Sequence, residues 1–200
     1  MDWFYYERQA VEAGYKVICG IDEAGRGPLF GPVYAAAVIL PDGCEIRGLN
    51  DSKKLSEKMR EQLFDIICEE ALAYGIGSAS AREIDKINIL QATFLAMRRA
   101  VEALRITPDW ALIDGNRMPS LPVPGETIVK GDGKSASIAA ASILAKVSRD
   151  RVLRQLDEQY PQYGFGKHKG YGTAAHYAAI REYGLLPEHR RSFLKNLSEK

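Results

Sequence analysis

Four acidic residues lie at or just beyond the ends of short apolar segments that we expect to be β-strands: Asp22, Glu23, Asp114 and Asp132. In open α/β sheets, chemistry gathers at strand ends, so these carboxylates are expected to converge on one side of a sheet. Carboxylates held together repel each other, and hard divalent cations such as Mg²⁺ or Mn²⁺ relieve that repulsion. Two such ions about 3.5–4 Å apart bind one phosphate between them, which makes a phosphodiester the natural substrate.

Each acid also has a simpler explanation as a turn former. Asp114-Gly115 and Asp132-Gly133 are ordinary turn dipeptides, and for either one alone we prefer that interpretation. The recurrence of acids at three strand ends favours a shared site, although sequence alone does not show that the strands are neighbours. The set contains no cysteine or histidine, which argues against zinc.

Two glycine-containing loops partly match phosphate-binding motifs. Residues 131–135 lie between a strand and a helix, but a Walker motif needs glycine where Ile128 stands. A nucleotide-binding NTPase or kinase that uses this loop is therefore a weaker alternative. Residues 25–31 resemble a dinucleotide fingerprint only loosely, because the third glycine is one position late and Pro28 interrupts the helix start.

The order of expected elements indicates a mixed sheet flanked by helices, hence an α/β fold. Apolar runs predict strands, and helical periodicity with end signals predicts helices. Ser80 and Glu83 match a capping box, and the apolar stripe behind them is expected to be core rather than a binding groove. The expected strands are 16–21, 32–40, 75–79, 110–113 and 126–130, and the expected helices are 56–75, 80–104, 135–160 and 173–184.

Composition describes a globular chain of 200 residues, 46% apolar and 26% charged, with one main domain. Cys19, Cys44 and Cys68 form no close pair, so neither a disulfide framework nor a zinc ribbon is indicated. No basic-then-apolar signal opens the sequence, and apolar runs such as 33–40 are too short to span a bilayer. We therefore expect a cytoplasmic protein without membrane contact.

Charge is divided unevenly along the chain. Residues 1–145 hold 16 Lys/Arg and 20 Asp/Glu, whereas residues 146–200 hold 11 and 6, together with all three histidines. The simplest explanation is a solvated basic face, and an acidic site beside it would favour a nucleic-acid partner. A non-catalytic nucleic-acid-binding module is a further alternative, but it gives no reason for the acids. His168 and His176 are expected to be packing or phosphate-side residues.

Several motifs then occur in a fixed order: Gly20-Ile-Asp-Glu-Ala-Gly-Arg-Gly27 with Gly31-Pro-Val33, Asp51-Ser-Lys-Lys-Leu-Ser56, Asp114-Gly115, Lys130-Gly-Asp132, Ser137-Ile-Ala-Ala-Ala-Ser142, Ala145-Lys-Val147 and His168-Lys-Gly-Tyr-Gly-Thr173. Together they resemble type 2 ribonuclease H (ribonuclease HII), from about residue 16 to about residue 193. No departure occurs at an expected catalytic position.

The resemblance implies a ribonuclease H-like domain over residues 1–160 and a helical C-terminal extension over 161–200 that completes the substrate site. It implies hydrolysis of RNA in RNA–DNA hybrids and incision 5′ to single ribonucleotides in duplex DNA, leaving a 3′-hydroxyl and a 5′-phosphate. The role implied is ribonucleotide removal from DNA by a monomer, with a replication clamp as a candidate partner. The four acids become the catalytic ligands of two Mg²⁺ or Mn²⁺ ions.

Substrate selection needs further residues, because two metals would cleave any phosphodiester within reach. The 2′-hydroxyl distinguishes RNA from DNA, and the glycines of the Gly25-Arg26-Gly27 loop let backbone groups approach a sugar closely. By resemblance this loop binds that hydroxyl and Tyr171 stacks on the sugar of the next deoxyribonucleotide, although a positive-φ loop and a packed aromatic explain them too. The candidates for phosphate contacts are Lys53, Lys146 and Lys169, for each of which solvent exposure is the simpler explanation.

Overall fold

A five-stranded mixed sheet organises the chain in the computed structural model, which describes residues 2–194. The strand order is β3-β2-β1-β4-β5. Strand β2 pairs antiparallel with both β1 and β3, whereas β4 pairs parallel with both β1 and β5. The strands are β1 (Ile18–Ala24), β2 (Val33–Ile39), β3 (Ala73–Ala79), β4 (Trp110–Asp114) and β5 (Gly125–Ile128). The carboxyl ends of β1 and β4 therefore lie side by side at one edge of the sheet.

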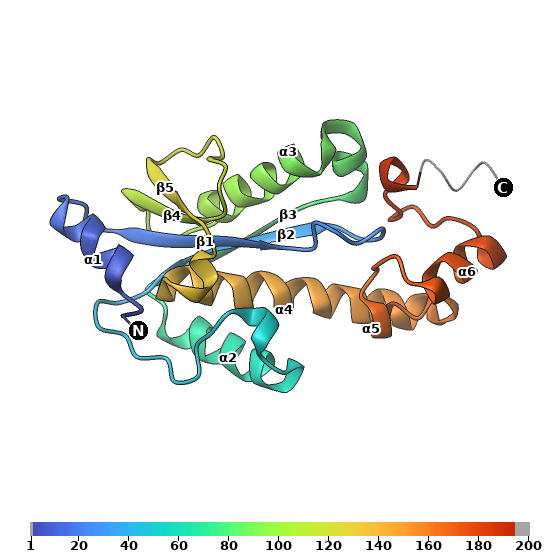
Figure 1. Ribbon diagram of the computed structural model, residues 1–200, viewed down its shortest axis with the longest axis horizontal. Coiled ribbons are helices and arrows are strands. Elements are labelled where there is room, and N and C mark those ends of the chain that lie inside the picture. Colours follow the sequence, from blue (N-terminus) through green and yellow to red (C-terminus); the bar gives the residue numbers. More distant parts are fainter. Residues whose placement is uncertain (1, 195–200) are drawn as a thin grey trace.

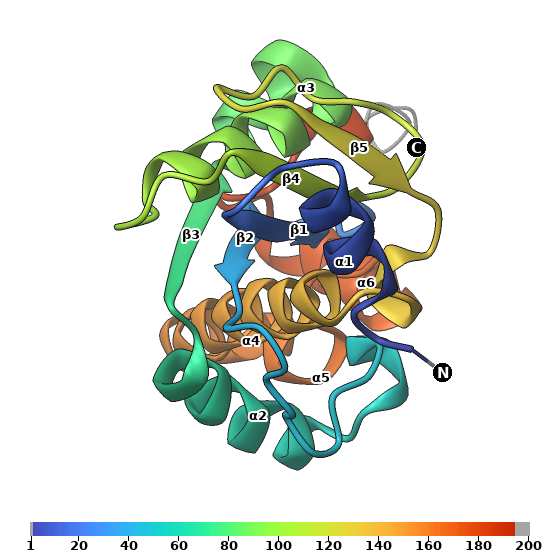
Figure 2. The same cartoon turned by 90° about the vertical axis from the view of Figure 1, so that its left-hand side faces the viewer.

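Helices cover both faces of this sheet (Figures 1 and 2). The α-helices are α1 (Tyr5–Glu12), α2 (Glu57–Glu70), α3 (Ala81–Glu102), α4 (Ala136–Gln159), α5 (Phe165–His168) and α6 (Ala174–Tyr183). Helix α3 packs on one face with a core that includes Ile21 and Ile113, whereas α4, backed by α2, packs on the other with a core that includes Ala36 and Val38. The mixed α/β fold flanked by helices is thus confirmed.

Close approach of α4 to β1 depends on small residues. A Cβ on Gly20 would lie 2.1 Å from the carbonyl carbon of Ser137, so only glycine fits at this position of β1. Alanines 139–141 of the facing helix turn are fully buried. The start of α4, and the turn that precedes it, are consequently held directly against the central strand.

The C-terminal extension packs against the loop that follows β1. Phe30 in that loop stacks on Phe165 of α5 with ring centroids 3.8 Å apart, and Leu153 of α4 joins the same core. Figure 1 shows α5 and α6 beyond the sheet, near the C-terminal end of α4. The extension therefore supports the loop that contains residues 25–27.

The helix expected over residues 80–104 is interrupted. Asn88 has φ 66°, and its Oδ1 accepts the backbone N–H groups of Leu90 and Gln91, so the side chain caps a second helical segment. The apolar periodicity continues across this break, which is why the sequence predicts one unbroken helix. The capping box formed by Ser80 and Glu83 is present as expected.

Other boundaries differ for local reasons. Helix α1 was not expected, and α2 ends at Glu70 because Ala71 is extended and leads into β3. Strand β5 stops at Ile128, two residues early, and Lys130 beyond it takes a left-handed φ of 58°. No helix within residues 2–194 combines the length and the apolar character needed to cross a membrane.

Candidate active site

The structure brings the four sequence-predicted acids to one edge of the sheet. Asp22 and Asp114 each follow the paired residues Ile21 and Ile113 of the parallel strands β1 and β4. Asp132 lies in η2 (Gly131–Gly133), a 3₁₀ turn between β5 and α4. The sequence left open whether these strands are neighbours, and the sheet order makes them so.

Two hydrogen bonds fix the carboxylates relative to the backbone. Asp114 Oδ1 accepts the N–H of Gly131 at 2.6 Å, which ties the turn carrying Asp132 to the end of β4. Asp22 Oδ1 accepts the N–H of Glu23 at 2.7 Å. Both contacts leave the second carboxylate oxygen free of a protein donor, since no other hydrogen bond involves either group within residues 2–194.

Electrostatics at this edge are unfavourable without a cation. Asp22 and Asp132 are only 5% and 6% exposed. Burial, followed by the charges of Glu23 and Asp114, raises the pKa of Asp22 well above its ordinary value. Burial and Asp114 likewise raise the pKa of Asp132, and burial raises the pKa of Glu23 although Arg26 opposes it. The four acids therefore destabilise one another when all are charged.

Positive charge is accordingly favoured beside these acids. Lys53, in η1 (Ser52–Lys54), places its Nζ 3.7 Å from Asp132 Oδ2 while its side chain remains 79% exposed. Burial acts to lower the pKa of Lys53, but the charges of Asp22, Asp132, Asp51 and Asp114 together outweigh it, so the net shift is upward. The η1 turn is held by Asp51, which accepts the N–H of Lys53 at 2.9 Å.

The donor set fits a hard divalent cation. It consists of carboxylate oxygens alone, the ligands that Mg²⁺ and Mn²⁺ prefer. Within residues 2–194, no group of three acidic, histidine or cysteine side chains is already arranged so that it could hold a metal ion. The charges of Glu23, Asp114 and Asp132 nevertheless all act to raise the pKa of Asp22, and this repulsion makes a cation stabilising.

A groove joins two of the acids, Asp22 and Glu23, to most of the predicted substrate residues. It is lined by Asp22, Glu23, Ala24, Gly25, Arg26, Gly27, Ser52, Lys53, Lys146, Arg149 and Tyr171. Tyr171 is half exposed, and a Cβ on Gly27 would lie 3.3 Å from its Cε1, so ring and loop are adjacent. Lys146 reaches the groove but pairs with Asp150 at 2.7 Å, and burial lowers its pKa.

Lys169 is placed differently from the other two lysines. It does not line the groove with the loop and Tyr171, and its Nζ lies 3.8 Å from Glu57 Oε1 on α2. Its side chain is 16% exposed, and its backbone has a left-handed φ of 49°. The structure therefore brings Lys53 and Lys146 to the groove, but not Lys169.

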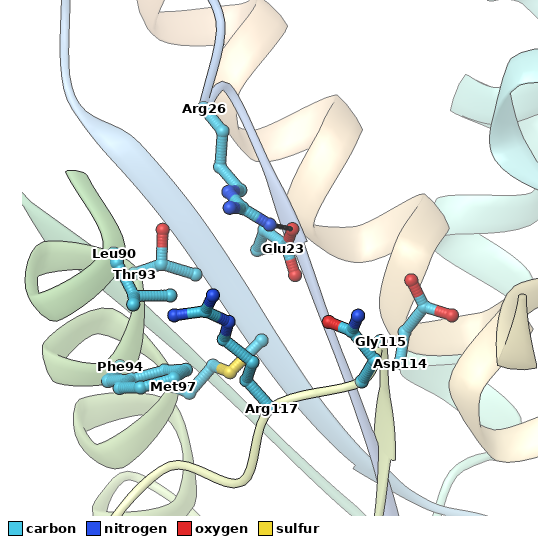
Figure 3. Close-up of a pocket in the computed structure, with 10 residues that line it drawn as sticks. Glu23, Arg26, Leu90, Thr93, Phe94, Met97, Asp114, Gly115 and Arg117 are labelled. Atoms are coloured by element: carbon cyan, nitrogen blue, oxygen red, sulfur yellow. Dashed lines mark hydrogen bonds and ion pairs between the residues drawn. The ribbon is translucent and has the colours of Figure 1, made fainter. Parts of the chain in front are cut away.

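A second pocket adjoins the acids on the α3 side (Figure 3). Figure 3 shows Arg26 and Arg117 pointing into it from different segments, with Glu23 nearby. Arg26 Nη1 lies 3.3 Å from Glu23 Oε1, whereas Arg117 has no acidic partner within ion-pair distance among residues 2–194. Leu90 and Phe94 form part of the wall, so the stripe expected to be core is partly pocket lining.

The turn at residues 131–135 does not form a phosphate-binding loop. Gly131 donates its N–H to Asp114, and the N–H groups of Lys134 and Ser135 donate to the carbonyl of Gly131 at 2.8 and 2.9 Å. The Lys134 ammonium donates to the carbonyl of Val129 at 2.8 Å. With its donors used internally, this turn lacks what a P-loop supplies to phosphates.

The three histidines form a structural group behind Tyr171, in which His176 and His189 are buried and His168 is half-buried. The N–H of Leu186 donates to His189 Nδ1, so the neutral His189 ring carries its proton on Nε2, which lies 3.1 Å from His176 Nε2. His176 Nδ1 lies 2.9 Å from the carbonyl of Tyr171, and His168 stacks on His176 with centroids 4.6 Å apart. Burial, followed by His176, lowers the pKa of His189 to about 4.

Two buried arginines beneath residues 25–32 were missed by sequence reasoning. Arg149 and Arg190 are 1% and 0% exposed, and both donate to backbone carbonyls. Both lie in the basic C-terminal part of the sequence, where an isolated arginine is most simply explained as solvent-exposed. Residue type and spacing gave no signal for them.

The arrangement defines a ribonuclease H-like protein, and solved structures with this fold agree. Ribonuclease H2 from Pyrococcus horikoshii OT3 superimposes with a TM-score of 0.74, 28% identity, and coverage of 88% of this chain and 93% of that one. RNase HII in the PCNA:RNase HII complex from Archaeoglobus fulgidus superimposes with a TM-score of 0.68 and 27% identity, covering 88% of this chain and 94% of that one. Bst-RNase HIII in complex with Mn²⁺ shares the fold, at a TM-score of 0.67 with 19% identity, covering 88% of this chain and 65% of that one.

Sequence comparison makes the assignment narrower. The model of the family described as Ribonuclease HII matches residues 19–196. Ribonuclease HII from Acetivibrio thermocellus is 58% identical over 191 residues, covering 96% of this chain and 75% of the relative. Ribonuclease HII from Aliivibrio salmonicida is 59% identical over 180 residues, covering 90% of this chain and 87% of the relative. The chain belongs to the Ribonuclease HII family and is an endoribonuclease, a hydrolase acting on RNA.

Proposed function

We propose that the chain hydrolyses RNA paired with DNA and also incises 5′ to single ribonucleotides embedded in duplex DNA. Family membership supports the first part, endoribonuclease activity on RNA–DNA hybrids. The second part is supported by one observation: the groove places a glycine loop and an exposed tyrosine directly beside Asp22 and Glu23, two of the four carboxylates. The expected products carry a 3′-hydroxyl and a 5′-phosphate, and the biological role is ribonucleotide removal from DNA.

Asp22, Glu23, Asp114 and Asp132 are the proposed ligands of two Mg²⁺ or Mn²⁺ ions. When bound, such ions supply an activated water and stabilise the leaving 3′-oxygen. The protein contributes the geometry: the parallel pair β1 and β4 presents Asp22 and Asp114 together, and the Asp114–Gly131 hydrogen bond brings in the turn of Asp132. The fold shared with manganese-bound Bst-RNase HIII supports this metal class.

The groove residues select the substrate in this proposal. Residues 25–27 bind the 2′-hydroxyl, since that group is the chemical difference between RNA and DNA that a protein can contact. Tyr171 stacks on the sugar of the deoxyribonucleotide on the 3′ side. Lys53 and Lys146 contact phosphates from the groove, and Lys169 contacts one only if its ammonium leaves Glu57.

The proposed role of residues 161–200 as an extension that completes the substrate site is supported by the place of Tyr171 in the groove and by the packing of Phe165 on Phe30. A replication clamp is a proposed partner, supported by the clamp complex of the Archaeoglobus fulgidus relative. The basic tail at residues 195–200 lies outside the described residues. A monomeric state and a cytoplasmic location remain predictions.

Cleavage of labelled duplexes tests the proposed function. The substrates are an RNA–DNA hybrid, a DNA duplex with one internal ribonucleotide and an all-DNA duplex, each incubated in Mg²⁺, Mn²⁺ or EDTA. Metal-dependent cutting of the first two alone supports the proposal. Cutting of the all-DNA duplex at a similar rate, or cutting in EDTA, would contradict it.

A further inference from the structure

The two buried arginines are unusual because of their partners. Neither Arg149 nor Arg190 lies within ion-pair distance of an acidic side chain among residues 2–194, although both are essentially inaccessible to solvent. Burying a charge is costly unless hydrogen bonds satisfy it. Burial, followed by the neighbouring Arg149, lowers the pKa of Arg190 to about 9. Because burying two guanidinium groups destabilises the fold unless they are satisfied, their hydrogen-bond partners indicate what they do.

Backbone carbonyls satisfy both guanidinium groups. Arg190 donates through Nη2 to Gly25 O at 2.6 Å, through Nη1 to Arg26 O at 3.0 Å and through Nε to Gly31 O at 2.9 Å. Arg149 donates to the carbonyls of Phe30, Pro32 and Lys169 at 3.1–3.2 Å. Arg190, from the C-terminal extension, thus holds the loop of residues 25–27 from inside the protein.

This contact determines where the loop's N–H groups point. In a trans peptide the C=O of one residue and the N–H of the next point in opposite directions, and no peptide bond within residues 2–194 is cis. Holding the carbonyls of Gly25 and Arg26 inward therefore directs the N–H groups of Arg26 and Gly27 outward. Arg26 and Gly27 are exposed, and within residues 2–194 neither N–H donates to a protein acceptor.

The outward N–H groups face the substrate groove. Arg26 and Gly27 line it, and Gly27 is adjacent to the Tyr171 ring. Gly25 has φ 95°, and a Cβ there would lie 2.1 Å from Arg149 Nε. Only glycine at this position therefore lets the loop pack directly on Arg149. A charged donor on the inner carbonyls also polarises the peptide groups, which strengthens the outer N–H donors.

We propose that Arg190, assisted by Arg149, is a specificity-determining residue that presents the N–H groups of Arg26 and Gly27 to the ribonucleotide 2′-hydroxyl. The inference rests on the proposed function, because it assigns the positioning behind that recognition. Arginine is required rather than lysine, because its planar fork meets two adjacent carbonyls at fixed angles whereas an ammonium is a point charge. The C-terminal extension therefore acts on recognition through the loop as well as through Tyr171.

Binding measurements can separate this role from catalysis. In an Asp114→Asn background that prevents cleavage, affinity is measured for duplexes that carry a ribonucleotide, a deoxyribonucleotide or a 2′-fluoro nucleotide at one position. The parent should prefer the ribonucleotide duplex. Arg190→Lys should reduce that preference by roughly 5–10-fold, the size expected for lost hydrogen bonds, while affinity for the all-DNA duplex stays within about twofold. Arg191→Gln, an exposed neighbour, is the matched control and should keep the preference.

Each outcome decides the proposal. If Arg190→Lys melts like the parent and keeps the full preference, the proposal is wrong. If Arg190→Lys fails to fold, Arg149→Lys takes its place and must lose preference without losing all-DNA affinity. If the parent itself binds ribonucleotide and all-DNA duplexes equally, 2′-hydroxyl recognition in the proposed function fails and the role of Arg190 fails with it. Parent preference with an unaffected variant overturns the role of Arg190 alone.

Discussion

Asp114 and Gly131 are joined by a 2.6 Å hydrogen bond from the glycine N–H to the aspartate Oδ1. The bond connects the carboxyl end of β4 to the turn that carries Asp132. One aspartate thus contributes charge to the site and also fixes the position of another. Structural and chemical roles of Asp114 are separable, because an amide oxygen can accept the same bond without the charge.

Asp114→Asn should therefore abolish most cleavage while leaving the fold intact. The loss in kcat should exceed the roughly 10–100-fold typical of losing a partner that only orients a metal ligand. Asp114→Ala removes the acceptor too and should also lower the melting temperature. Glu126→Gln, exposed on the neighbouring strand β5, is the control and should retain full activity. Full activity of Asp114→Asn would remove Asp114 from the catalytic set.

Metal-free Asp22→Asn should be more stable than the parent at neutral pH. Burial and neighbouring acids raise the pKa of Asp22 in the folded state, so charging it costs folding free energy above its unfolded value near 3.8. The penalty is present at pH 7 and disappears as pH falls toward 4. The melting temperature of the variant should exceed that of the parent by a few degrees at pH 7, and the two should converge in acid.

The same pair of proteins tests metal binding without an activity assay. Saturating Mg²⁺ or Mn²⁺ should raise the parent's melting temperature, because the ions bind the folded state preferentially. Asp22→Asn should show a smaller rise. An unchanged parental melting temperature at saturating metal would contradict the carboxylate site.

Arg117 should contribute one phosphate contact. It faces the pocket beside Glu23 without an acidic partner among the described residues. Arg117→Gln should weaken duplex binding similarly for all sequences and reduce the slope of log affinity against log salt by about one. Arg98→Gln, exposed on α3, is the control for charge alone. An unchanged slope for Arg117→Gln would show that the duplex does not reach this pocket.

His189 should make stability depend on pH in the opposite direction to Asp22. Burial lowers its folded-state pKa to about 4, below the ordinary 6.5, so the neutral ring contributes stability above pH 6.5. That contribution is lost as pH falls from 6.5 toward 4. The difference in melting temperature between the parent and His189→Gln should therefore shrink over this interval. If the difference in melting temperature stayed constant over this interval, protonation of His189 would not be the cause of the pH dependence.

The acids could be predicted from the sequence because apolar runs mark the strands and the acids follow the ends of those runs. Asp22, Asp114 and Asp132 each follow an apolar run, and topology then made them neighbours. The break at Asn88 was invisible, since the apolar period of α3 continues through it. Burial of Arg149 and Arg190 was equally invisible, because it depends on carbonyls more than 100 residues away in sequence. Long-range backbone contacts leave no local pattern.

The most direct test of the account is the position of the cut in a DNA duplex with one internal ribonucleotide, mapped with Mg²⁺ by mass analysis of both product ends. The account predicts a single incision on the 5′ side of the ribonucleotide, with a 3′-hydroxyl on one product and a 5′-phosphate on the other. It also predicts that Asp114→Asn loses most of this product. A cut on the 3′ side, a 2′,3′-cyclic phosphate, or unchanged cleavage by Asp114→Asn would contradict a metal site formed by these four carboxylates.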